Sequence, residues 1–133
     1  MVPINYVTVL VATVVAIVLG HIWYGPLFGK KWMALSGITP QGKPMTRTIV
    51  GMIVSSLVMA FVLAHSLVFA SAYLNASGVY AGAMAGFWNW LGFVAPVTFG
   101  MVLWEGKPLK LWCITAGYYL VSLVCMGIVI ALW

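Results

Sequence analysis

Four long stretches of apolar residues, almost free of charged side chains, constrain the fold of this sequence more than any other feature. They cover residues 4–24, 48–70, 79–103 and 109–132. The hydrocarbon core of a bilayer is about 30 Å thick, and an α-helix needs about 20 residues to cross it. Of all residues, 65% are hydrophobic and 5% are charged, whereas about a quarter are charged in soluble domains. We therefore predict an all-α integral membrane four-helix bundle that forms one transmembrane domain over residues 1–133.

The longest polar connection, residues 26–47, separates the first two apolar stretches. Within it, apolar and aromatic residues recur at spacings of three and four, which is the period of one helix face. This face consists of Leu27, Phe28, Trp32 and Leu35, together with Lys31. This pattern predicts a short helix that lies on the membrane surface with its aromatic face toward the lipid.

Lysine and arginine occur in only two of the connections, and this distribution predicts the orientation of the chain. They are Lys30, Lys31, Lys43 and Arg47 in the first connection and Lys107 and Lys110 in the third. Basic connections of membrane proteins lie in the cytoplasm, so we expect both termini on the other side. The net charge of +5 then faces anionic lipid headgroups, and each basic residue near the surface contributes about 1 kcal/mol of attraction to them. These residues make no long cluster, so we expect no nucleic-acid partner.

Small residues at a spacing of four begin the third apolar stretch: Gly78, Gly82 and Gly86. Small residues let two helix backbones approach closely, which matters in lipid because burial of apolar side chains there gives no hydrophobic gain. We predict that these glycines, with Gly51 and Ser55 of the second stretch, are helix-packing positions. Two interpretations stay open, namely packing inside one chain and contact between copies.

Two polar side chains, His65 and Asn89, lie inside the second and third apolar stretches. Counted from the same membrane boundary they are at similar depths, so we predict that they hydrogen-bond across a helix pair. Such bonds contribute about 0.6 kcal/mol on average in a membrane. The pair is either structural or part of a ligand site, since ionisable groups within a membrane are often functional.

A second polar pair is expected at the cytoplasmic boundary. The only acidic residue, Glu105, follows the third apolar stretch, and His21 lies near the end of the first. These two stretches run in the same direction, so both side chains reach the same boundary. Because histidine titrates near neutral pH, the pair would form a proton-sensitive gate. The alternative is that Glu105 balances Lys107 or Lys110 in a wet interface.

Groups suited to catalysis or metal binding are few. The fourth stretch carries hydroxyl groups at helical spacing, from Thr115, Tyr118, Tyr119 and Ser122, but such groups commonly bond to their own helix. No nucleophile with a base and an orienting group is evident, and two histidines far apart in depth make a poor metal site. We therefore expect no enzymatic activity, no cofactor and no metal.

Three segments carry a resemblance to a known family: WYGPLFGKKWM at residues 23–33, GFWNWLGF at residues 86–93 and LWCITAGYYLVSLVCMGIVIALW at residues 111–133. Through them the chain resembles the small bacterial membrane proteins known only as domain-of-unknown-function family 1761. The resemblance implies a four-span bundle, and hence a location in the bacterial cytoplasmic (inner) membrane. It carries no activity with it.

Packing signals are more abundant in this sequence than chemical groups. The first interpretation is therefore a non-enzymatic membrane protein that packs through its third stretch, as a homo-oligomer or as an accessory subunit of a larger membrane complex. The alternative is a small transporter or channel, with His65/Asn89 and His21/Glu105 along a path between helices. An enzyme is the least supported class, because one acid and two histidines supply little for acid and base catalysis.

Overall fold

The computed structural model describes residues 2–38 and 46–132, and these residues form helices and connections without any strand. Four helical segments are long and apolar enough to cross a membrane: Tyr6–Leu27, Thr46–Leu74, Gly78–Leu103 and Leu109–Ala131. The predicted all-α fold with four apolar helices is confirmed. These helices indicate a multi-pass membrane protein.

The first segment contains α1 (Tyr6–Ile22) and a π-helical turn, η1 (Trp23–Leu27). Asn5 begins α1, because its side-chain oxygen accepts a hydrogen bond from the Val7 amide at 3.0 Å, a common N-cap arrangement. Pro26 has no amide hydrogen to donate to the carbonyl four residues earlier. The Phe28 amide instead donates to the Trp23 carbonyl at 2.9 Å, so helical structure extends beyond the expected end at residue 24.

A short helix, α2 (Gly29–Ser36), follows directly. It ends at Gly37, which has a φ of 73°, a conformation that glycine adopts without the strain other residues meet. The helix predicted in the first connection is therefore present. The rest of that connection, residues 39–45 with Lys43, lies outside the described residues.

The second span is one uninterrupted helix, α3 (Thr46–Leu74), whereas the third is divided into α4 (Gly78–Phe93), α5 (Ala95–Thr98) and α6 (Gly100–Leu103). The first break follows from Pro96, whose ring clashes with the carbonyl four residues earlier. The Thr98 hydroxyl donates to the Val94 carbonyl at 2.6 Å and so stabilises the backbone at the break. The last span is α7 (Leu109–Ala131), which follows Pro108.

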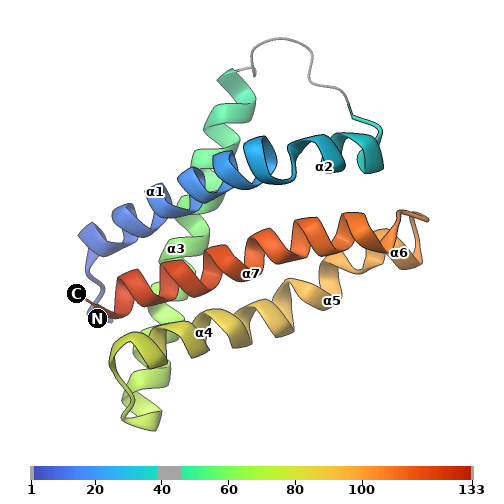
Figure 1. Ribbon diagram of the computed structural model, residues 1–133. Helices are drawn as coiled ribbons and strands as arrows, with labels where there is room; N and C mark the ends of the chain where they lie inside the picture. Colours follow the sequence, from blue (N-terminus) through green and yellow to red (C-terminus); the bar gives the residue numbers. More distant parts are fainter. Residues whose placement is uncertain (1, 39–45, 133) are drawn as a thin grey trace.

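Helix α7 lies at the centre of the fold (Figure 1). The segment α1–η1–α2 runs along one side of it and α4–α5–α6 along the other, while α3 crosses behind these three. The two chain ends lie together at one end of the molecule, and the α6–α7 connection lies at the opposite end. The first is named the terminal end of the bundle, and the second, which carries Lys107 and Lys110, is named the basic end.

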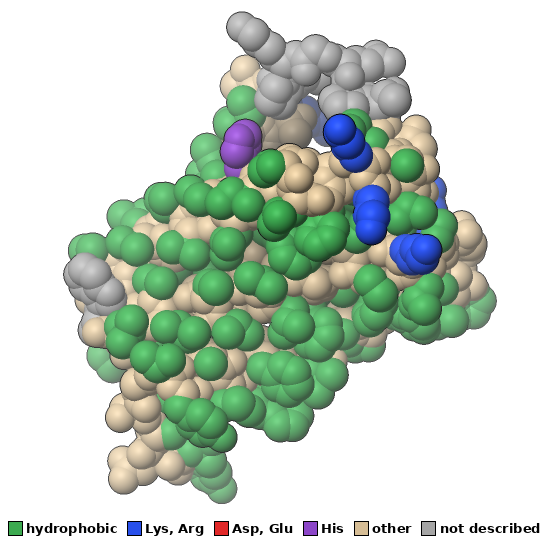
Figure 2. All heavy atoms as spheres, viewed as in Figure 1, with side chains coloured by type: hydrophobic (Ala, Val, Ile, Leu, Met, Phe, Trp, Pro, Cys, Tyr) green, Lys and Arg blue, Asp and Glu red, His purple; other side chains and the backbone are tan. Residues whose placement is uncertain are grey.

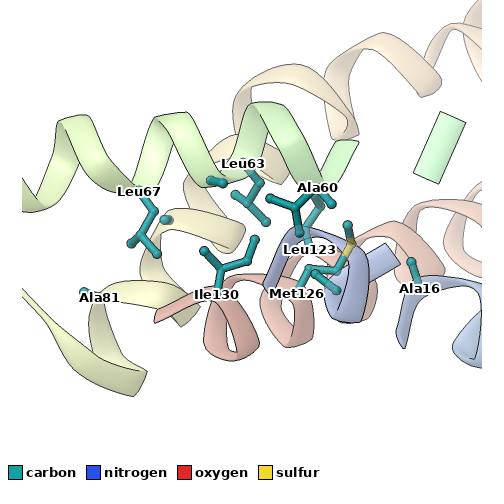
Figure 3. Packing of buried hydrophobic residues seen from close by; sticks show 12 residues of the cluster. Ala16, Ala60, Leu63, Leu67, Ala81, Leu123, Met126 and Ile130 are labelled. Atoms are coloured by element: carbon teal, nitrogen blue, oxygen red, sulfur yellow. The ribbon is translucent and has the colours of Figure 1, made fainter. Parts of the chain in front are cut away.

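Buried apolar residues from all four spans form one core in the half of the bundle nearest the terminal end. Leu63 and Leu67 of α3 lie over Leu123 and Ile130 of α7 (Figure 3). Small residues such as Ala12 and Ala60, which are fully buried, bring the helices close, and the larger Met126 is fully buried as well. Many large apolar side chains on the outer surface are exposed, as Figure 2 shows for one face. Such a surface suits lipid far better than water.

The tightest helix contact joins α4 to α7 through glycines. A Cβ atom added at Gly82 would collide with the Gly127 carbonyl oxygen, and one added at Gly86 would collide with the Leu123 carbonyl oxygen and lie 2.8 Å from the Val124 Cα. These two predicted packing positions thus lie in a backbone contact within one chain.

The other three predicted packing positions lie elsewhere. Gly78 begins α4 with a φ of 82°, and an added Cβ there or at Gly51 would have no neighbour within 4 Å among the described residues. Ser55 is exposed. Their helical spacing therefore does not correspond to a helix contact in the described chain.

Hydrogen bonds from large side chains attach both neighbouring segments to the α7 backbone. The Trp23 indole donates to the Ile114 carbonyl at 2.9 Å, and the Trp90 indole donates to the Ala116 carbonyl at 2.8 Å. Gly117 makes room for the first of these indoles, because an added Cβ would lie 3.2 Å from the Trp23 ring. Buried indole groups generally need such a partner, so these bonds fix the rotation of α7 between its neighbours.

Candidate functional site

Helix α3 packs on the other spans only from Ser56 onward. Its buried residues are Ser56, Ala60, Leu63, Ala64 and Leu67, whereas every residue from 46 to 55 is exposed. These first residues of α3 therefore diverge from α1 and α7 toward the basic end. A space opens between the helices where the core stops.

This space, here named the α3 cleft, is enclosed by α1 with η1, by α3 and by α7, and has a volume of about 640 Å³. Its apolar side chains include Ala16, Ile17, Met52 and Met59. Its polar side chains come from all three walls and are His21, Tyr24, Thr48, Ser55, Ser56, Tyr118 and Tyr119. Volumes of about 300–1,000 Å³ are typical of sites for small ligands.

Tyrosines form the side of the α3 cleft opposite α3. The Tyr118 hydroxyl donates a hydrogen bond to the Ala16 carbonyl at 2.7 Å, and the centroids of the Tyr24 and Tyr118 rings are 5.3 Å apart in an edge-to-face arrangement. Gly20 gives the Tyr118 ring its place, since an added Cβ would lie 3.0 Å from the Tyr118 hydroxyl oxygen. Both tyrosines are therefore held in position before any ligand binds.

A second cavity, of about 380 Å³, lies further along the same face of α3, against α4, α5 and α7. Asn89 and Thr98 contribute its polar groups together with Tyr119. Met59 and Tyr119 line both cavities, so these two side chains separate them. The second cavity is more apolar than the α3 cleft and contains no histidine or serine among its lining residues.

The α3 cleft is closed toward the terminal end. On α1 it extends from Ala16 toward Gly25, and on α3 from Thr48 to Met59, whereas the buried core occupies the adjoining helix turns, from Val9 to Ala16 and from Ala60 to Leu67. The basic residues that the structure describes are exposed and lie beyond the other end of the cleft: Lys30, Lys31, Arg47, Lys107 and Lys110. The cleft thus faces the basic end and stops at the core.

The structure does not join His65 to Asn89. The Asn89 side-chain amide donates to the Ser66 hydroxyl at 2.9 Å and to the Ala85 carbonyl at 2.8 Å. His65 Nδ1 lies 2.8 Å from the Phe61 carbonyl oxygen, and the imidazole stacks near the Phe61 and Phe69 rings on its own helix. The expected polar bond between the second and third spans exists, but Ser66 makes it.

His21 and Glu105 are also separate. His21 is exposed and lines the α3 cleft. Glu105 lies in the turn after α6 and lines a different cavity, beside Thr98 and Trp104. Among residues 2–38 and 46–132, no ion pair within 4.0 Å involves either side chain. Of the four predicted polar sites, His21 alone belongs to the α3 cleft.

A family described as a protein of unknown function, DUF1761, matches residues 7–131. The chain belongs to the DUF1761 family. The matched range includes all four spans, so the α3 cleft and the buried core both lie within the DUF1761 region. No curated protein and no solved structure matches the chain.

Several cleft residues of this DUF1761 chain were not predicted as site residues, notably Tyr24, Thr48 and Ser56. Their signal in the sequence is indirect. The Gly25-Pro26 pair produces the π-helical turn that places Tyr24, and π-helical turns are frequent at functional sites. The hydroxyl groups of the fourth span were visible as a pattern, but which of them meet another helix depends on how α3 crosses α7.

The α3 cleft offers hydrogen-bonding groups and apolar surface together. Its polar groups are hydroxyls and one imidazole, and no carboxylate lines it. Across the described part of the chain, no three side chains of His, Cys, Asp or Glu are grouped so that they could hold a metal ion. The arrangement suits hydrogen bonds to a polar group at one end and apolar contact at the other.

Proposed function

We propose that this DUF1761 chain is a non-enzymatic membrane protein that binds a small amphipathic molecule in the α3 cleft. The observation that carries this proposal is the position of the cleft, which faces the basic end and stops at the buried core. The wall residues match such a ligand. Thr48, Ser55 and His21 offer polar groups, and Met52 and Met59 offer apolar surface.

The closed inner end favours binding over an open channel. Between the cleft and the terminal end, Ala12, Ala60 and Met126 are 0% exposed, and water or an ion does not pass a close-packed apolar core. A transporter using this cleft would therefore have to separate α3 from α1 and α7. The transporter alternative thus becomes a carrier that alternates between two states rather than a pore.

The proposal includes an orientation. The basic end would face the cytoplasm, because lysine and arginine in short connections favour that side. Both termini would then face away from the cytoplasm in a bacterial cytoplasmic membrane. The cleft would be reached from the cytoplasmic side or from the cytoplasmic leaflet.

Filling the cleft tests the binding function. In Ser55→Trp, a large side chain enters the cleft from an exposed position, so the core should be undisturbed. Val50→Trp is the matched control, because Val50 lies on the same helix, is 52% exposed and is not a lining residue of the cleft. Native mass spectrometry from mild detergent should show a small molecule retained by the wild type and by Val50→Trp and lost from Ser55→Trp. Equal retention by both variants would contradict the proposal.

Assembly with a second copy or with another membrane subunit is a second candidate, favoured by the surroundings of His65. Its imidazole lies between Phe61 and Phe69, which are 41% and 59% exposed on the outer side of α3. Ionisable groups in spanning helices rarely face lipid, so a protein neighbour would stabilise this surface. The third span is less suited to assembly than its glycines indicate, because α7 already occupies Gly82 and Gly86.

The assembly candidate is tested on α3 rather than on the third span. His65→Leu in nanodiscs should change the mass of the assembly if this surface contacts another chain. The matched control is Val62→Leu, which changes an exposed apolar residue on the same helix. An assembly mass that is the same for the wild type and both variants would count against a role of His65 in assembly.

A further inference from the structure

We infer that the amphipathic molecule in the α3 cleft is an anionic phospholipid of the leaflet at the basic end. In this arrangement its phosphate lies at the cleft mouth near Arg47 and Thr48, and an acyl chain follows Met52 and Met59 inward. This inference rests on the proposed binding function and adds the chemical class of the ligand.

The length of the cleft along α3 is close to the thickness of one leaflet of a bilayer. Thr48 and Met59 mark its extent along α3 and are 11 residues apart in the sequence, or about 16 Å at 1.5 Å per residue. Half of a hydrocarbon core is about 15 Å. A lipid with its headgroup at the membrane boundary would therefore reach the end of the cleft with its chain, whereas a small water-soluble anion would leave the inner half empty.

The cleft also opens sideways, as a lipid site requires. No other described helix covers residues 46–55 of α3, all of which are exposed. On the facing wall, the cleft residues His21 and Gly25 of α1 and η1 are exposed as well. An acyl chain can thus enter from the surrounding bilayer without passing through water, and a second chain can stay in the bilayer.

Charge selects an anionic headgroup. Arg47 directly precedes the cleft residue Thr48 in the first turn of α3, and Lys30 and Lys31 begin α2 just after η1. Figure 2 shows Lys and Arg side chains gathered at this end of the visible face. The one acidic residue, Glu105, lines a different cavity. Basic pockets between spanning helices on the cytoplasmic side are known to bind anionic headgroups, and the arginine fork matches phosphate oxygens.

The test compares defined lipids on the full chain. Purified protein stripped of lipid is titrated with phosphatidylglycerol or with phosphatidylcholine of the same acyl chains, and bound lipid is counted by native mass spectrometry. The wild type should bind the anionic lipid more tightly. Arg47→Gln should weaken that binding about fivefold, since one basic residue contributes about that much near anionic headgroups. Lys110→Gln, at the same end but eight residues before Tyr118, the first cleft residue of its helix, should change it little.

Three further outcomes separate the lipid inference from the binding function. Loss of a neutral molecule from Ser55→Trp, with no preference for phosphatidylglycerol, would overturn the lipid inference and leave the binding function standing. Displacement of the bound lipid by inorganic phosphate would show that the site recognises a free anion, and would also overturn the inference. Equal losses in Arg47→Gln and Lys110→Gln would mean that charge acts only at the general surface, which contradicts a site in the cleft.

Discussion

Among single residues, Asn89 shows most clearly what counting along a sequence can and cannot establish. Depth estimates predict a bond between His65 and Asn89, but the partner of Asn89 on the second span is Ser66. Consecutive residues of an α-helix point about 100° apart. A one-residue difference therefore moves a side chain from the helix interface to the outer surface, and only the packed structure reveals which of the two residues faces α4.

The Asn89–Ser66 bond predicts a coupling energy that the neighbouring histidine should lack. A double-mutant cycle with Asn89→Ala and Ser66→Ala, measured by unfolding in detergent micelles, should give about 0.6 kcal/mol, the average for such bonds in membranes. The matched cycle with Asn89→Ala and His65→Ala should give a coupling near zero. A larger coupling to His65 than to Ser66 would show that the two helices pack with a different rotation.

At the scale of elements, the contact between α4 and α7 could be predicted from the sequence on the α4 side only. The spacing of Gly82 and Gly86 predicts a close approach of two backbones, but many helices offer a small residue as a partner. The structure shows Gly127 of α7 facing Gly82, and although Gly127 and Ala131 are also four residues apart, Gly117 of the same span is an alternative partner by sequence. The partner could not be predicted because it depends on the relative rotation and height of two helices.

Gly86→Ala should destabilise the α4–α7 contact. The added methyl group would meet the Leu123 carbonyl and the Val124 Cα, which are backbone atoms that cannot turn aside, and forced overpacking typically costs about 1–3 kcal/mol. Gly92→Ala is the matched control in the same helix, because an added Cβ there has no neighbour within 4 Å among the described residues. Unfolding free energies in detergent should fall for the first variant and stay unchanged or rise slightly for the second. Equal changes of the unfolding free energy in the two variants would indicate that helix propensity, not packing, determines the effect of an added methyl group.

The helix irregularities at Pro26 and Pro96 show a similar limit. A proline inside an apolar stretch predicts an interruption, yet the two prolines give different outcomes. At Pro26 the helix continues through a π-helical turn into α2, whereas near Pro96 it divides into short helices. At Pro26 the Phe28 amide bonds to the Trp23 carbonyl five residues earlier, whereas near Pro96 the Thr98 amide keeps the ordinary bond to the Val94 carbonyl four residues earlier. Neither bond follows from composition.

For the whole molecule, the steep crossing of α3 behind the other spans determines where the cleft lies (Figure 1). The long apolar stretches predict four spans but contain no information about how the spans cross. Because α3 meets the others only from Ser56 onward, the bundle is open on the α3 side in the half nearest the basic end. The exposed basic residues lie at the open end, so the orientation of the chain in the membrane would determine which leaflet the open end faces.

The orientation is the prediction that belongs to the whole molecule. Lysine and arginine in the first and third connections should hold the basic end in the cytoplasm, so the α3–α4 turn should lie outside. In a chain with Cys113 and Cys125 replaced by serine, a membrane-impermeant thiol reagent should label Ser77→Cys in intact cells. It should label Lys107→Cys only in inside-out vesicles. Both positions are exposed, so accessibility of the side chain is matched. Labelling of Lys107→Cys in intact cells would reverse the orientation and move the mouth of the α3 cleft to the outer leaflet.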